Sequence, residues 1–180
     1  WLLFGAFGLP VKLHTARLYT DELPTLLKQF HPGKTAPTMR TPDGVVVPET
    51  IAIAEELASR HPQAGIWPAD PKARAVARVL AAEMHAGFTA LRSHCPMNLR
   101  VSYHDCAPPA EVLADLARLE TVWAWAKSQT GGVWLAGDYS AADAFYAPVA
   151  ARIADQAHQR LCPHGRSGTR GVIRRRGSNL

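Results

Sequence analysis

Hydrophobic and polar positions follow one pattern up to about residue 62 and a different one after it. In the first part, two short β-rich stretches flank Pro42-Asp43-Gly44, an arrangement that predicts a β-hairpin. Helical spacing of apolar residues then begins at Glu49 and ends at His61-Pro62. Residues 1–62 are therefore predicted to form a small α/β unit.

Beyond a linker at residues 63–69, apolar residues recur every three or four positions, which is the spacing of amphipathic helices. Asp70-Pro71 favours a helix start, with Asp as the N-cap and Pro at the first helical position. The apolar positions that follow predict one long helix: Val76, Leu80, Met84, Phe88 and Leu91. A second helix is predicted from about Pro109 and a third from Ser140, so residues 70–154 are predicted to be all-helical.

Ser140 and Asp143 have the spacing of a capping box at the start of the third helix. In such a box the Ser140 hydroxyl accepts a hydrogen bond from the backbone amide three residues on. The Asp143 carboxylate in turn accepts from the backbone amide of the cap residue. Both side chains are therefore predicted to serve the structure.

The end of the chain differs from the rest in charge and composition. Residues 151–180 hold seven Arg and one Asp, whereas the other 150 residues hold 13 basic and 14 acidic groups. The formal net charge of +5 is thus a property of the tail. Because residues 161–180 contain only five hydrophobic residues, they cannot easily offset their ordering entropy. We expect residues 155–180 to be a basic, disordered tail.

Composition indicates a globular protein of a reducing compartment. Hydrophobic residues make up 47% of the chain, enough to bury a core. The apolar run at residues 1–10 is too short for the roughly twenty residues that cross a bilayer, and it lacks the charged front of a signal peptide. Three cysteines without a CxxC pair fit a cytosolic protein better than a disulfide scaffold.

Several blocks of sequence, in order, resemble the bacterial cytosolic glutathione transferases, on the branch that includes the zeta-class maleylacetoacetate isomerases. The resemblance covers roughly residues 1–154. The blocks that carry it are Pro32-Gly33-Lys34-Thr35-Ala36-Pro37-Thr38, Asp43-Gly44, Pro48-Glu49-Thr50-Ile51-Ala52-Ile53, Trp67-Pro68-Ala69-Asp70-Pro71, Ala82-Glu83-Met84-His85-Ala86-Gly87-Phe88, Leu91-Arg92, Pro96-Met97-Asn98-Leu99-Arg100 and Ala142-Asp143-Ala144-Phe145-Tyr146-Ala147-Pro148-Val149.

The resemblance implies an α/β plus all-α architecture. A thioredoxin-like N-terminal domain at residues 1–62, with its first strand missing, would precede the helical bundle of a glutathione transferase. It also implies a glutathione-binding site, assigned to five residues: Lys34, Ala36, Pro37, Glu49 and Thr50. A cis peptide before Pro37 would let the backbone of Ala36 pair with the tripeptide as an added strand does. The glutamyl α-carboxylate would lie at the helix N-terminus beside Thr50, with its ammonium near Glu49.

Each of these positions also has a purely structural interpretation. Pro37 is compatible with an ordinary trans-proline at a strand start, since cis is the minority state. Thr50 fits a simple helix cap, and Glu49 fits an acid that favours a helix N-terminus. The ordered combination of motifs is what favours binding.

In the related family, a Ser, Cys or Tyr near the end of the first strand stabilises the glutathione thiolate. A nearby donor is needed because a free thiol has a pKa of about 8.5. Tyr19 and Thr15 lie too far along the chain to be equivalent. We therefore expect this residue upstream of Trp1 and assign no catalytic residue within the chain.

The resemblance places the second-substrate pocket on the long helix, at Met84, Phe88 and Arg92. His85 is a further candidate to project into this cleft with Arg92. Core packing is the alternative for Met84 and Phe88, and a solvated face is the equal alternative for His85 and Arg92. His94-Cys95 with His104-Asp105-Cys106 lacks the paired spacing of a metal site, so no metal is predicted. The arginine run 174–176 suggests phosphate contacts, but a solvated tail is the favoured interpretation.

Taken together, the resemblance implies an enzyme that adds the glutathione thiolate to a small electrophile. Two alternatives remain: glutathione-dependent maleylacetoacetate isomerisation, and a non-catalytic ligand-binding protein with the same fold. Glutathione is the expected co-substrate, and a cytoplasmic homodimer that binds neither nucleic acid nor membrane is the expected form.

Overall fold

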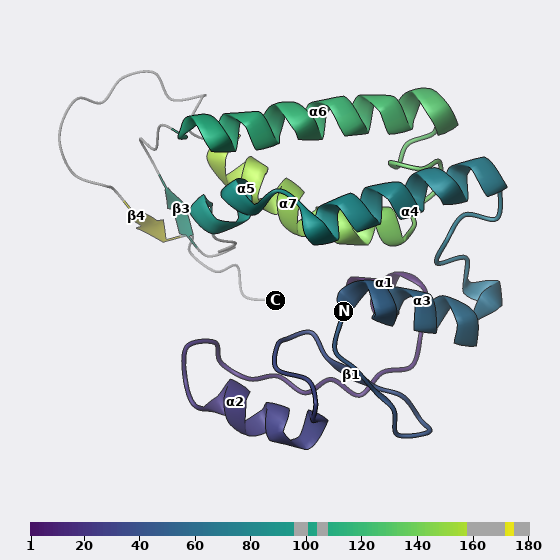
Figure 1. The fold of residues 1–180 in the computed structure, drawn as a ribbon, viewed down its shortest axis with the longest axis vertical. Helices are drawn as coiled ribbons and strands as arrows, with labels where there is room; N and C mark the ends of the chain where they lie inside the picture. The colour runs from purple at the N-terminus through teal and green to yellow at the C-terminus, as the bar shows by residue number, and fades with distance from the viewer. Residues whose placement is uncertain (96–100, 104–107, 158–171, 175–180) are drawn as a thin grey trace.

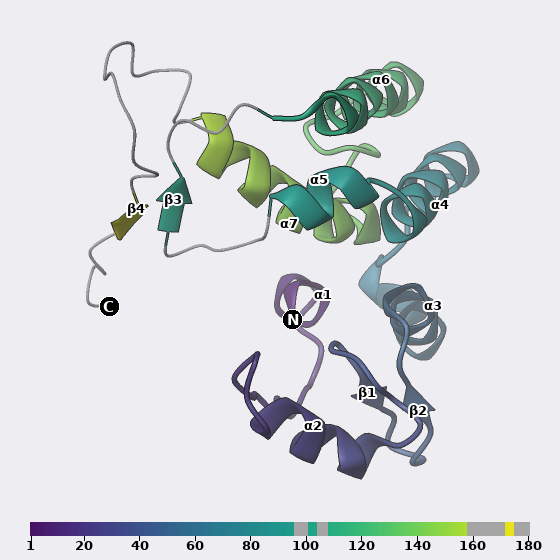
Figure 2. The same cartoon turned by 60° about the vertical axis from the view of Figure 1, so that its left-hand side comes forward.

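The structure, a computed structural model, describes residues 1–95, 101–103, 108–157 and 172–174. Figures 1 and 2 show an N-terminal unit on one side and the helices α4 to α7 on the other. In chain order the elements are α1 (Leu2–Ala6), α2 (Glu22–Leu27), β1 (Met39–Arg40), β2 (Val46–Val47), α3 (Thr50–Arg60), α4 (Pro71–Ala86), α5 (Thr89–His94), β3 (Val101–Tyr103), α6 (Ala110–Thr130), α7 (Ala141–Ala157) and β4 (Val172–Arg174), with 3-10 turns at Lys28–Phe30 and Pro62–Ala64.

The predicted hairpin is present as the antiparallel pair β1–β2. Met39 pairs with Val47, and Arg40 pairs with Val46. The buried Thr41 closes the turn, because its backbone N–H donates to Val45 O and its hydroxyl accepts from the Val45 N–H, each at 2.9 Å. Local residues thus determine both the position and the register of the hairpin.

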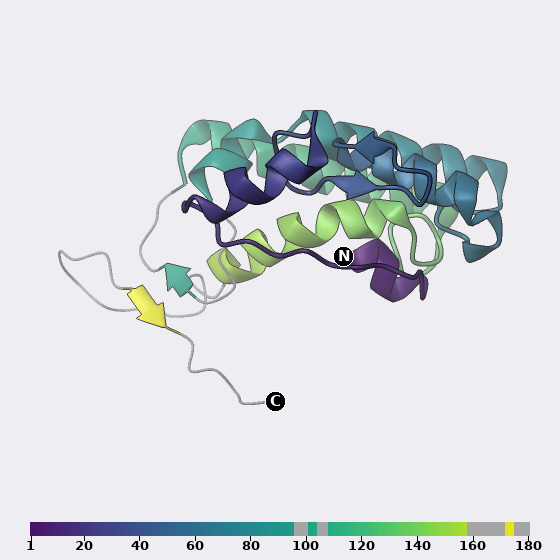
Figure 3. The same ribbon diagram turned by 90° about the horizontal axis from the view of Figure 1, so that it is seen from below.

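The core lies mainly between helices of the second unit. Helix α4 packs against both α6 and α7, and α5 packs against α6. Helix α3 joins this core from the N-terminal unit, and α1 lies beside α7 (Figure 3). Fully buried side chains at helical spacing fill the centre: Ala77, Leu80, Ala81, Leu91, Val112, Leu119, Ala126 and Val149. The amphipathic pattern in the sequence therefore matches the faces that are buried.

Helix α4 begins as the sequence predicts, with Asp70 as its N-cap. Asp70 Oδ2 accepts from the backbone N–H groups of Lys72 at 2.9 Å and Ala73 at 3.3 Å. Pro71 occupies the first helical position, where its missing N–H costs nothing.

The prediction of one continuous helix through Leu91 is wrong, because α4 ends at Ala86 and α5 starts at Thr89. A Cβ on Gly87 would lie 2.8 Å from the carbonyl oxygen of Glu83, which is too close for a side chain. The backbone at this position therefore favours glycine. Phe88 follows with φ of 57°, in the left-handed region. Both Phe88 and Leu91 still reach the core, which is why the apolar spacing continues across the break.

The start of α7 is organised around a buried carboxylate. Asp143 Oδ2 accepts from the Ser140 backbone N–H at 2.9 Å, as a capping box requires. The Ser140 hydroxyl donates to the same carboxylate at 3.3 Å rather than accepting from an amide. Asp143 Oδ1 also accepts from the Leu135 backbone N–H at 3.0 Å. One carboxylate thus links the helix start to the preceding loop.

Part of the predicted tail has regular structure. Helix α7 continues to Ala157, and β4 pairs antiparallel with β3, with Val101 opposite Arg174. The predicted disorder of residues 155–180 stays a prediction, because most of that segment lies outside the described residues. No helix in the described part of the chain is long and apolar enough to cross a membrane.

Candidate functional site

The N-terminus of α3 carries two of the residues that the sequence singles out. Glu49 is the N-cap in an extended conformation, and Thr50 is the first helical residue. The first bond of the helix runs from the Ile53 N–H to Glu49 O at 2.8 Å. The N–H groups of residues 50–52 therefore have no partner inside the helix and can serve an anion.

His85, in the last turn of α4, lies against both of these residues. Its Nδ1 is 3.1 Å from the Thr50 hydroxyl oxygen, and its Nε2 is 3.6 Å from Glu49 Oε2. The His85 side chain is 36% exposed and that of Glu49 is 62% exposed, so the group is open to solvent on one side. The N-cap residue Glu49 makes no side-chain capping bond to α3 in the described structure, and the Thr50 hydroxyl has the His85 imidazole as its partner.

The loop before β1 contains the other predicted contacts. The peptide bond between Ala36 and Pro37 is cis, which is one of the two alternatives that the sequence left open. Both residues are exposed. Within the described residues, the backbone groups of Ala36 take part in no hydrogen bond with another backbone group. The loop thus presents a short piece of exposed backbone.

Lys34 is exposed and borders a groove of about 450 Å³ that runs along α2. Its lining is mostly apolar and includes three basic residues: Lys28, His31 and Lys34. This arrangement favours an anionic group next to apolar atoms. No described contact joins Lys34 to the Glu49–Thr50 pair.

Two of the three residues predicted to line a second-substrate pocket are buried in the core, and the third is exposed. Met84 and Phe88 are only 7% and 5% exposed and belong to the hydrophobic core. The Phe88 ring meets Tyr146 edge-on, with centroids 6.2 Å apart. The guanidinium of Arg92 is exposed and donates to the carbonyl oxygens of His85 and Gly87, each at 3.3 Å. Met84 and Phe88 are thus core residues, and their place in a second-substrate pocket stays a prediction.

Positive charge accumulates where α5 meets α7. Arg152 Nε donates to Cys95 O at 2.8 Å, and its NH1 donates to Pro148 O at 3.0 Å. Burial and then the nearby charge of Arg92 lower the pKa of Arg152.

The His and Cys residues weighed as a metal site are only partly described: His104, Asp105 and Cys106 lie outside the described residues. Within the described part, no group of three metal-ligating side chains occurs.

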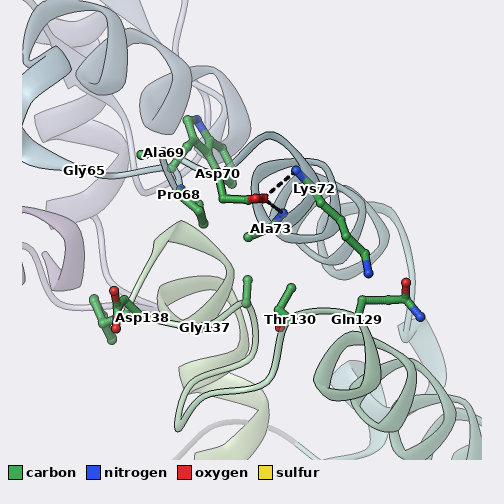
Figure 4. A pocket seen from close by; sticks show the side chains of 13 residues that line it. Gly65, Pro68, Ala69, Asp70, Lys72, Ala73, Gln129, Thr130, Gly137 and Asp138 are labelled. Atoms are coloured by element: carbon green, nitrogen blue, oxygen red, sulfur yellow. Dashed lines mark hydrogen bonds between the residues drawn. The ribbon is translucent and has the colours of Figure 1, made fainter.

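A second hollow, of about 530 Å³, lies between the start of α4 and the loop that precedes α7 (Figure 4). Figure 4 shows Asp70 at its edge, with its carboxylate already bonded to the amides of Lys72 and Ala73. No predicted site residue lines this hollow, so it is separate from the group around Glu49. Its lining residues include Trp67, Pro68, Gln129, Thr130, Gly137, Asp138 and Tyr139.

Sequence reasoning missed the link between His85 and the start of α3. It placed the His85 side chain either toward the cleft or on a solvated face, and it had no signal for a partner 35 positions earlier in the chain. The contact depends on how α3 and α4 pack, which no local pattern specifies. The adjacent Glu49-Thr50 pair could be found because both residues belong to one short motif.

Comparisons with known proteins agree with this geometry. Residues 1–60 match the family described as the glutathione S-transferase N-terminal domain. A probable maleylacetoacetate isomerase from Caenorhabditis elegans is 34% identical over 79 residues, which is 44% of this chain and 36% of that protein. The matched region thus spans about a third of that curated relative.

Among solved structures, the fold is similar to a glutathione transferase homolog from Sulfitobacter that was crystallised with bound glutathione. The TM-score is 0.59 at 21% sequence identity, over 88% of this chain and 80% of that one. The likeness confirms the predicted fold class, a thioredoxin-like domain followed by a helical domain. Residues 1–60 therefore match the glutathione S-transferase N-terminal domain, and the chain has a fold similar to that of a glutathione transferase homolog.

Proposed function

We propose that the chain binds glutathione at the N-terminus of α3 and along the exposed backbone before β1. One observation carries this proposal: the helix amides at the start of α3 have no partner inside the helix, and the exposed Glu49 carboxylate lies at the same helix end. The Sulfitobacter homolog, which has the same fold, holds glutathione in its crystal structure. That likeness supports glutathione as the ligand of this chain too.

The glutamyl end of the tripeptide suits the start of α3. An α-carboxylate gains from the helix dipole and from the N–H groups of residues 50–52. The Thr50 hydroxyl can donate one further hydrogen bond to it. The neighbouring ammonium group can pair with the Glu49 carboxylate, which is exposed enough to be reached.

The rest of the tripeptide suits the loop before β1. The exposed backbone of Ala36, next to Pro37, can pair with the cysteinyl backbone in the manner of an added strand. Lys34 would attract the glycyl carboxylate through its ammonium group. These three contacts would hold the ligand at both ends and in its middle.

The proposed reaction is attack of the glutathione thiolate on an electrophilic carbon, which forms a C–S bond and expels a leaving group. Among the residues that the structure describes, we assign none to stabilising the thiolate. For this chain the proposal therefore concerns the binding half of the reaction. It includes a role in detoxification, a cytoplasmic homodimer and an apolar pocket for the electrophile at the helical domain.

A second candidate function is glutathione-dependent isomerisation of maleylacetoacetate, favoured by the 34% identity to the Caenorhabditis elegans protein. There the thiolate adds to an activated double bond, the new single bond rotates, and elimination releases the thiolate unchanged. Turnover of maleylacetoacetate well above that of an aryl halide would favour this candidate. A ligand-binding protein without turnover would show binding and neither activity.

Isothermal titration with glutathione tests the binding proposal. We expect Glu49→Ala to weaken binding about tenfold, as loss of one charge-assisted contact predicts. Glu56→Ala serves as the matched control, because Glu56 lies on the same helix and pairs only with Arg60 in the described structure. Absence of binding by the native protein at millimolar glutathione would rule out the proposed function for this chain.

A further inference from the structure

We propose that His85 is a positioning residue of the glutathione site: it holds the Thr50 hydroxyl and the Glu49 carboxylate in the arrangement that receives the glutamyl group. This inference rests on the proposed function and adds a helical-domain residue to a site otherwise formed by residues 1–62. His85 acts through its two neighbours and needs no contact of its own with the ligand.

The two ring nitrogens of His85 face two different partners. Nδ1 lies 3.1 Å from Thr50 Oγ1, which is a hydrogen-bond distance. Nε2 lies 3.6 Å from Glu49 Oε2, too long for a hydrogen bond but within range of an ion pair. One imidazole therefore spans both side chains at the start of α3.

The direction of the Thr50 bond determines what Thr50 can offer a ligand. When Nδ1 carries a proton, His85 donates to Thr50 Oγ1, and the hydroxyl proton is free to point elsewhere. A ligand carboxylate only accepts, so it needs that proton. If instead the Thr50 hydroxyl donated its hydrogen bond to an unprotonated Nδ1, it would have no proton left for the ligand. Donation by His85 thus prepares Thr50 to bind an anion.

The position of His85 is itself fixed from several sides. Met84, the residue before it, is buried in the core, and the guanidinium of Arg92 donates to the His85 carbonyl oxygen at 3.3 Å. The imidazole therefore projects from a well-anchored helix end. Because α4 belongs to the helical unit, this contact joins the packing of that unit to the start of α3.

Titration calorimetry with S-methylglutathione, which lacks a free thiol, separates this role from thiolate chemistry. Five proteins are compared: native, His85→Phe, His85→Asn, Thr50→Val and the double variant Thr50→Val/His85→Phe. We expect His85→Phe to weaken binding about tenfold, since it leaves the hydroxyl without its donor. His85→Asn keeps a donor amide near the Nδ1 position and should stay within about threefold of the native affinity.

In the Thr50→Val background, His85→Phe should weaken binding by much less than tenfold, because the part of the His85 effect that runs through the Thr50 hydroxyl is already lost and only the part through Glu49 remains. A purely structural role predicts a different result: both His85 variants would weaken binding equally, and the effects of Thr50→Val and His85→Phe would add. Either of those results would overturn the inference. Thermal unfolding of each protein without ligand checks whether all five are folded at the titration temperature.

Failure of the inference and failure of the proposed function give different results. If the native protein does not bind, the proposed function is wrong and the inference falls with it. If the native protein binds and His85→Phe binds within twofold, only the inference is wrong. Should His85→Phe not fold, the imidazole ¹⁵N resonances of the native protein decide: saturating S-methylglutathione must shift those of His85, and an unchanged spectrum would overturn the proposal.

Discussion

The Asp115 carboxylate on α6 accepts a hydrogen bond from the backbone N–H of Leu91 in α5, at 2.9 Å. Leu91 is the third residue of α5, and its N–H is one of those that a helix leaves unpaired at its start. The N-cap residue of α5, Phe88, supplies no side-chain cap. A residue 24 positions away therefore performs the capping.

Replacing Asp115 with Ala should lower the free energy of unfolding by about 1 kcal/mol, the usual cost of losing a capping side chain. Asp115→Asn keeps an acceptor oxygen and should lose less. Urea unfolding followed by circular dichroism measures both values. Glu120→Ala, an exposed position on the same helix, is the control and should change little. Equal stability of the Asp115→Ala and native proteins would contradict the capping role.

The Asp143 carboxylate should matter more than any single cap, because it is 7% exposed and accepts from both Ser140 and Leu135. Its removal would leave one buried and one partly buried amide unpaired. We expect Asp143→Ala to cost about 3 kcal/mol. Ser140→Ala removes only a hydroxyl donor 3.3 Å away and should cost about 1 kcal/mol. Denaturant midpoints compare the two, and a larger loss for Ser140→Ala would refute this order.

The adjacent glycines 131 and 132 offer a matched pair for testing a close backbone approach. Both have positive φ, 65° and 80°, so both substitutions carry backbone strain. A Cβ on Gly131 would meet nothing within 4 Å, whereas one on Gly132 would lie 2.6 Å from the Gly137 carbonyl oxygen. We expect Gly132→Ala to cost about 2 kcal/mol more than Gly131→Ala. Thermal unfolding of both variants measures the difference, and equal costs would contradict it.

The sequence predicts a structural feature well when the residues that interact to form it lie close together along the chain. Asp70 and Asp143 act on amides within a few residues, and the β1–β2 turn closes through Thr41, so short patterns sufficed. The break between α4 and α5 escaped prediction because Phe88 and Leu91 keep the apolar spacing of one helix. The close approach of the Gly87 backbone to Glu83 at the break leaves no trace in that spacing.

The residues of the candidate site also fall into two groups, those that lie in one short motif and those that meet only through helix packing. Glu49 and Thr50 lie in one motif and could be named from the sequence, and so could Pro37. His85 reaches them only because α3 and α4 pack together, and Asp115 reaches α5 only because α6 lies beside it. Such contacts depend on the angles between helices. Those angles follow from the whole core, so a window of sequence does not contain them.

Tyr146 provides a test of the core through alkaline pH. Burial, and then the charge of Glu83, raise its pKa above the ordinary value of 10.0. The unfolded chain loses the tyrosine proton at about pH 10, while the folded chain keeps it. Stability from this group is therefore complete below about pH 10 and falls as the pH rises further.

Tyr146→Phe should remove this dependence, since phenylalanine has no proton to lose. At neutral pH the change should alter the free energy of unfolding by less than about 1 kcal/mol, because the Tyr146 hydroxyl has no hydrogen-bond partner among the described residues. Urea unfolding at pH 7, 10 and 11 measures both effects. Tyr19→Phe is the control, because Tyr19 is fully exposed. If Tyr146→Phe and the native protein lost stability equally between pH 10 and 11, the buried and un-ionised state of Tyr146 would be disproved.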